Sequence, residues 1–96
     1  MNETELSVLR VGIDQANQDI VNALARRFKL TRAVGRYKKE NDLPTIDPIR
    51  ETELLEAIEQ QAIAEGIDPK LCRAIFQLVL EQVHTEHDDI KQSVLS

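Results

Sequence analysis

The amino-acid sequence predicts an all-α fold with three helices per chain, in which a long first helix makes an intertwined, helix-swapped homodimer. The chain has 96 residues, of which 42% are apolar and 30% are charged, as is typical of a single globular domain. Glycine and proline number three each, too few for the many turns of a β fold. No proline interrupts residues 4–40. We therefore expect one helical domain over residues 1–96.

A heptad pattern of apolar residues predicts the first helix, from about Thr4 to Glu40. The seam positions of this pattern are Leu6, Ile13, Ile20, Arg27 and Val34, together with Leu9, Ala16, Ala23, Leu30 and Tyr37. Such a helix would be about 50 Å long, whereas a compact chain of this size is only about 30–35 Å across. We therefore expect the seam to pack against a second copy of the same chain.

The tripeptide Ile-Asp-Pro, at residues 46–48 and 67–69, predicts the starts of the second and third helices. Aspartate is a favoured N-cap, and proline is favoured at the first helical position. The second helix is expected to run from Pro48 until Gly66, a typical residue just beyond a helix end. The third is expected to run from Pro69 to near the end of the sequence. Its apolar side contains Cys72, Phe76, Val79, Val83 and Ile90.

Positive charge is concentrated in residues 20–39, which contain seven lysines and arginines and no acidic residue. The whole chain nevertheless carries a net charge of −5. Proteins that bind nucleic acids usually have a basic face with less acid beside it, and often use aromatic side chains to stack bases. Here only three residues are aromatic. We therefore expect a local pocket for a small anion and no nucleic-acid partner.

Other features of the sequence argue against export, membrane insertion and metal binding. The first residues, MNETELSVLR, are acidic where a signal peptide is basic, and no apolar run approaches the length of a membrane span. Cys72 is the one cysteine, without other ligands at zinc-like spacing. We expect a cytoplasmic protein with no membrane partner and no metal, and we expect Cys72 to be a small core residue.

The spacing of three cations along the first helix suggests how a small anion is held. Arg27 occupies an otherwise apolar seam, where a charge is costly unless it is paired. Arg27 and Lys38 lie within roughly 20° of one face and about 16 Å apart along the axis, so their long side chains can converge. Arg10 is roughly 25 Å from Arg27 and about 100° round the helix. Arg10 can therefore reach such a pocket only in the other copy of an antiparallel dimer.

The order of the charged and apolar residues resembles the all-helical chorismate mutases of the AroQ class. The landmarks are Leu9-Arg10, Ile13-Asp14, Arg27, Val34-Gly35, Lys38, Asp47, Arg50-Glu51 and Ile75-Phe76-Gln77-Leu78, and they span nearly the whole chain. The resemblance implies an intertwined dimer that converts chorismate to prephenate in phenylalanine and tyrosine biosynthesis, without a cofactor. It also implies that each active site is completed by an arginine of the other copy.

The resemblance also implies roles for individual residues. Arg10 of the partner subunit and Arg27 would hold the two carboxylates of chorismate, and Lys38 would donate to the ether oxygen of the breaking bond. Glu51 would accept a hydrogen bond from the ring hydroxyl. Arg50 and the backbone of Asp47 would shape the same side, although the sequence alone also fits Asp47 as an N-cap and Arg50 as an ordinary first-turn charge.

Two positions of the third helix depart from the AroQ pattern, which usually has Ser and, four residues later, Gln or Glu. These positions are Val83 and His87 here. Val83 cannot hydrogen-bond a carboxylate. His87 is either a second donor to the ether oxygen or a partly exposed residue near the end of the helix, and His84 is expected to be a bystander.

Other activities remain open on the same sequence. Isochorismate pyruvate lyase and 4-amino-4-deoxychorismate mutase use similar pockets, but Glu51 suits a ring hydroxyl and favours chorismate. A non-catalytic helical binding or regulatory protein is an alternative of a different class. A further shikimate-pathway enzyme is a possible activating partner. Gly35 costs up to about 1 kcal/mol against Ala in a helix interior, and the sequence leaves open whether it allows a close packing contact.

Overall fold

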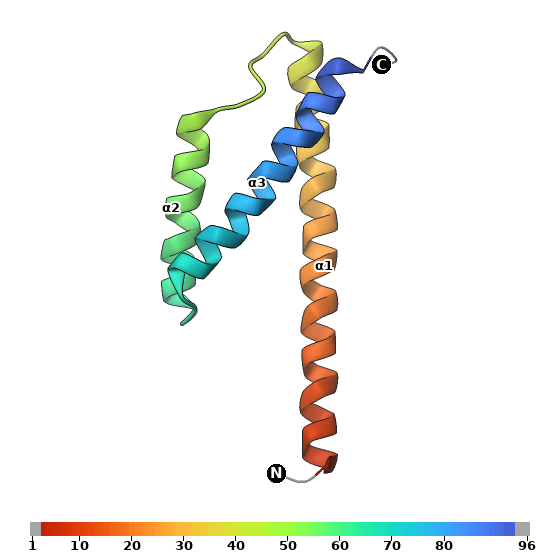
Figure 1. Ribbon diagram of the computed structural model, residues 1–96, viewed down its shortest axis with the longest axis vertical. Coiled ribbons are helices and arrows are strands. Elements are labelled where there is room, and N and C mark those ends of the chain that lie inside the picture. The colour runs from red at the N-terminus through yellow and green to blue at the C-terminus, as the bar shows by residue number, and fades with distance from the viewer. Residues whose placement is uncertain (1–2, 94–96) are drawn as a thin grey trace. The chain divides into compact units, whose positions relative to one another are not determined.

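The computed structural model describes residues 3–93 and confirms an all-α chain with a long first helix (Figure 1). The helices are α1, Glu3–Glu40; α2, Pro48–Ala64; and α3, Pro69–Gln92. The described residues contain no β-strand. Each observed helix agrees with its expected range, because proline and the caps fix where a helix can begin or end.

The chain divides into two compact units, Met1–Thr31 and Arg32–Ser96. The described part of the first unit is the greater part of α1. Apolar seam residues there lie on the surface, and Ile13, Ile20 and Leu30 are each 58–61% exposed. A row of large apolar side chains in water is unfavourable, at about 25 cal/mol for each Å² left unburied.

The starts of α2 and α3 are fixed by the caps that the Asp-Pro pairs predict. The side chain of Asp47 accepts a hydrogen bond from the backbone N–H of Arg50 at 3.1 Å. The side chain of Asp68 accepts one from the backbone N–H of Lys70 at 2.9 Å. These bonds satisfy donors that have no partner inside the helix, and they confirm both predicted N-caps.

The ends of α1 and α2 share one turn geometry. Asp42 follows α1 with φ of 56°, and Gly66 follows α2 with φ of 74°, both in the left-handed region. In each turn the next backbone N–H donates to a carbonyl of the last helical turn at 2.8 Å, as in a Schellman motif. The prediction that Gly66 lies just beyond a helix end is confirmed. Asp42 meets the same requirement with a side chain that tolerates the conformation less well than glycine.

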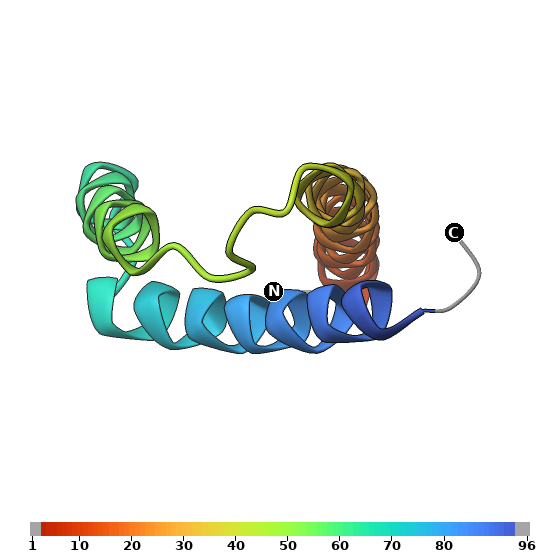
Figure 2. The same ribbon diagram turned by 90° about the horizontal axis from the view of Figure 1, so that it is seen from above.

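The core of the second unit lies between α2 and α3, and Figures 1 and 2 show the first half of α3 beside α2. Its buried apolar residues are Leu55, Ala62, Val79, Leu80 and Val83. Cys72 lies at an intermediate depth. The packing brings the acidic start of α2 toward the side of α3 that carries the two histidines, since Glu51 contacts His84.

Residues 3–93 show no feature of a membrane span or of a metal site. None of their helices combines the length and the apolar character that crossing a bilayer requires. No group of three or more His, Cys, Asp or Glu side chains among these residues is arranged to hold a metal ion.

Candidate functional site

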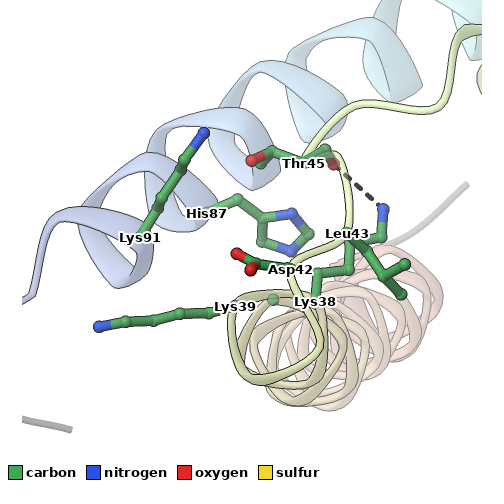
Figure 3. A pocket seen from close by; sticks show the side chains of 8 residues that line it. Lys38, Lys39, Asp42, Leu43, Thr45, His87 and Lys91 are labelled. Atoms are coloured by element: carbon green, nitrogen blue, oxygen red, sulfur yellow. Dashed lines mark hydrogen bonds between the residues drawn. The ribbon is translucent and has the colours of Figure 1, made fainter.

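The second unit contains a basic pocket of about 330 Å³ where the last turns of α1, the following loop and α3 meet (Figure 3). Its lining residues are Gly35, Lys38, Lys39, Asp42, Leu43, Thr45, His87 and Lys91. The volume suits a small organic ligand. Three lysines against one aspartate make the lining cationic, so the pocket favours an anion.

Lys38 is a half-buried cation of this pocket, and its ammonium group is held by the loop after α1. Its Nζ donates a hydrogen bond to the backbone carbonyl of Thr45 at 3.1 Å (Figure 3). An ammonium group has three donors, so this bond leaves two for a ligand. The bond therefore holds a positive charge at the pocket wall without using up its capacity to donate.

His87 is buried in the same wall, with only 5% of its surface exposed. Its ring lies directly over Gly35: a Cβ at position 35 would be 2.7 Å from Cδ2 and 3.0 Å from Nε2. Real carbon atoms in contact lie about 3.5–4.0 Å apart. Gly35 therefore allows this close contact, which the sequence left open, and His87 is not the partly exposed residue of the simpler interpretation.

Lys39 and Lys91 are the other lysines that line the pocket. In Figure 3 the ammonium group of Lys39 extends away from the ring of His87. Nζ of Lys39 donates to the backbone carbonyl of Ser93 at 2.6 Å. These two side chains contribute to the positive potential around the pocket, whereas the ammonium group of Lys38 and the ring of His87 lie at its wall.

Glu51 lies in the first turn of α2, and the structure pairs it with His84 of α3. Nε2 of His84 and Oε2 of Glu51 are 2.7 Å apart, and the two side chains are 33% and 25% exposed. This contact differs from the sequence-based expectation, in which His84 is a bystander. One signal was available: His84 lies one helical turn before His87, so it borders the same side of α3.

Two of the remaining predicted residues of the second unit, Val83 and Asp47, serve visible structural purposes. Val83 is buried in the core between α2 and α3. The side chain of Asp47 is engaged as the N-cap of α2, and Arg50 is exposed in the first turn. Val83 lies one turn before His87, so the two share a face of α3.

Arg10 and Arg27 both belong to the first unit. Arg10 is exposed on α1, and Arg27 is half-buried. The structure thus brings Lys38 and His87 to one pocket, and it places both predicted carboxylate-binding arginines on the unit whose apolar seam is exposed.

Comparison with known proteins covers most of the chain. The sequence model of a family described as chorismate mutase type II matches residues 9–87, a range that includes every predicted site residue. A T-protein of Enterobacter agglomerans is 32% identical over 85 residues, which are 88% of this chain and 23% of that protein. A chorismate mutase of Methanocaldococcus jannaschii is 27% identical over 77 residues, 80% of this chain and 78% of that protein.

A relative named for a different activity is also similar. A 4-amino-4-deoxychorismate mutase of Streptomyces pristinaespiralis is 24% identical over 84 residues, which are 88% of this chain and 65% of that protein. The chain therefore spans less than a quarter of the T-protein and about two thirds of the 4-amino-4-deoxychorismate mutase.

Proposed function

Because the chain belongs to the chorismate mutase type II family, we propose that it catalyses the rearrangement of chorismate to prephenate in phenylalanine and tyrosine biosynthesis. The observation that carries the proposal is the family match over residues 9–87. The cationic pocket with Lys38 and His87 at its wall supports it, because chorismate is a small dianion.

Catalysis of this rearrangement requires selection of the reactive conformer of chorismate and fixed positive charge near its ether oxygen. In the rearrangement the bond between the ether oxygen and the ring breaks while a carbon–carbon bond forms within the same molecule. The atoms balance without a nucleophile or an external proton. A protein accelerates such a reaction by holding the compact reactive conformer and by placing donors where the ether oxygen gains negative charge.

Lys38 and His87 are the proposed donors to the ether oxygen. Their shared pocket supports this assignment. Lys38 is already held by the Thr45 carbonyl, so its charge needs little rearrangement when substrate binds. His87 takes the position at which the family usually has Gln or Glu, and Val83 is proposed as an apolar wall beside the substrate, four residues earlier on the same face of α3.

The start of α2 is proposed to bind the ring side of chorismate. Glu51 accepts a hydrogen bond from the ring hydroxyl, with Arg50 and the backbone of Asp47 beside it. The N-cap at Asp47 supports this arrangement, because it fixes the first turn of α2 from which Glu51 projects.

The two carboxylates of chorismate are proposed to bind Arg27 and Arg10 of the partner subunit in an intertwined homodimer. The exposed apolar seam of the first unit supports a second copy of this chain as its occupant, because burying that seam removes apolar surface from water. A cytoplasmic location, and activation by another shikimate-pathway enzyme, remain predictions of the sequence.

A second candidate substrate is 4-amino-4-deoxychorismate, because one relative carries that activity in its name. The substrate differs from chorismate at the ring position that Glu51 is proposed to recognise. The lower identity of that relative, 24% against 32% for the T-protein, makes it the second choice.

Product identification tests the proposal. The purified chain is incubated separately with chorismate, 4-amino-4-deoxychorismate and isochorismate, and the products are identified by chromatography and mass spectrometry. We expect prephenate from chorismate at the highest rate, and a much lower rate from the Lys38→Ala variant. Turnover of one of the other substrates alone would replace the proposed activity, and a folded protein inert toward all three would support a binding or regulatory role.

A further inference from the structure

The pair formed by His84 and Glu51 joins α2 to α3 at a residue proposed to recognise the substrate. We propose that His84 is a positioning residue, whose Nε2–H holds one oxygen of Glu51 so that the other oxygen is aimed at the ring hydroxyl. The inference rests on the proposed function, and it assigns a role to a residue that neither the sequence pattern nor the resemblance singled out.

The geometry of the pair is that of a strong hydrogen bond. The distance of 2.7 Å between Nε2 and Oε2 is at the short end for nitrogen and oxygen, as expected when the acceptor is charged. An ionised carboxylate only accepts hydrogen bonds, so the imidazole is the donor. The two residues are 33 positions apart and lie on different helices, so the bond exists only in the folded chain.

Glu51 is only partly buried, so the bond to His84 can fix one carboxylate oxygen while the other stays accessible to a ligand. The side chain is 25% exposed, so it is partly shielded from water and still open to a ligand. A free glutamate side chain samples many rotamers, and binding a ligand with it requires that this freedom be lost. His84 fixes Oε2 before substrate arrives. Oε1 has no hydrogen-bond partner within residues 3–93 and is the oxygen available to a hydroxyl.

A second ion pair between the same helices provides a matched control. Arg73 of α3 donates to Oε1 of Glu59 of α2, with side chains 41% and 33% exposed. This pair also joins α2 to α3, and neither residue belongs to the proposed site. If His84 merely holds the two helices together, Arg73→Leu and His84→Phe should have the same consequences.

The experiment measures kcat and KM for chorismate in the wild type and in His84→Phe, His84→Gln and Arg73→Leu, with thermal unfolding to verify that each variant folds. Phe keeps a ring of similar size without a donor, whereas Gln retains an N–H. We expect His84→Phe to lower kcat/KM about tenfold, the effect of losing a hydrogen bond to a charged group. The loss should fall mainly in KM, because the ring hydroxyl gains no charge in the transition state and its hydrogen bond to Glu51 is equally strong before and during the reaction.

The same series includes the Glu51→Ala background. We expect His84→Gln to remain within about threefold of the wild type, and Arg73→Leu to leave KM unchanged. In Glu51→Ala, a further His84→Phe change should alter kcat/KM by less than about twofold, because His84 then has no carboxylate to position.

The contrary results distinguish a failure of the role of His84 from a failure of the proposed function. Equal kcat/KM in the wild type and His84→Phe would overturn the role of His84 and leave the proposed function intact. A loss that persists in Glu51→Ala, or that Arg73→Leu reproduces, would also overturn it. A wild type that does not turn over chorismate would overturn the proposed function itself, and the role of His84 with it.

Discussion

Replacing Gly35 by alanine tests the contact between α1 and His87 on which the pocket wall depends. The added Cβ would lie 2.7 Å from Cδ2 of His87 and 3.1 Å from Cδ1 of Ile90. Both distances are shorter than the roughly 3.5 Å of an ordinary carbon contact. The ring of His87 is buried, so it must leave its position for the methyl group to fit.

The expected change in stability is a difference between two opposing terms. Alanine in place of glycine stabilises a helix interior by up to about 1 kcal/mol. Forcing an extra methyl into a packed contact costs about 1–3 kcal/mol. The second term is larger, so we expect Gly35→Ala to lower the free energy of unfolding by about 1 kcal/mol. A ring displaced by about 1 Å should also lower kcat for chorismate by about tenfold to a hundredfold.

Gly12 is the matched control in the same helix. A Cβ at Gly12 meets no atom of the described chain within 4 Å, so Gly12→Ala should raise the free energy of unfolding by up to about 1 kcal/mol and leave kcat unchanged. Urea unfolding at one fixed protein concentration gives both values, since the stability of a dimer depends on concentration. In a His87→Ala background, the cost of Gly35→Ala should fall because the nearest obstacle is gone. If Gly35→Ala stabilises the protein as Gly12→Ala does, with kcat unchanged, the described contact does not exist.

Two further predictions concern the end of α1. Lys38→Ala should lower kcat by about 10²–10³ with little change in KM, because charge on the ether oxygen develops only in the transition state; steady-state kinetics with an unchanged kcat would exclude Lys38 as that donor. Asp42→Gly should raise the free energy of unfolding by about 0.5–1 kcal/mol, since glycine adopts positive φ at less cost, whereas Gly66→Ala in the equivalent turn should lower it by about 1 kcal/mol. Urea unfolding in which Asp42→Gly lowers the free energy of unfolding, or Gly66→Ala raises it, would contradict the described turns.

The helices could be predicted from the sequence because their determinants are local. Asp47 and Asp68 each precede a proline and cap the helix that follows, and Gly66 supplies the positive φ after α2. The absence of proline from residues 4–40 leaves α1 uninterrupted. Each of these signals acts within one or two turns, where spacing along the chain determines which groups can meet.

The contacts of the site could not be predicted in the same way, because they join residues far apart in the sequence. Glu51 and His84 are 33 positions apart, and nothing in either local pattern indicates the partner. The burial of His87 depends on a glycine 52 positions earlier, and a histidine near the end of a helix looks exposed by position alone. Helical periodicity gives the face on which a residue lies, but not the element that covers this face.

Mixing two inactive variants measures most directly whether this chain forms a chorismate mutase site that two copies share. Arg10→Ala and Arg27→Ala are each expected to form prephenate at a small fraction of the wild-type rate. After unfolding together and refolding in equal amounts, random pairing gives about half heterodimers, each with one site that has both arginines intact. We expect recovery of about a quarter of the wild-type rate, with sedimentation giving twice the 10.9 kDa chain mass. Heterodimers verified by mass spectrometry that remain as inactive as either variant would contradict a site completed by Arg10 of the partner subunit.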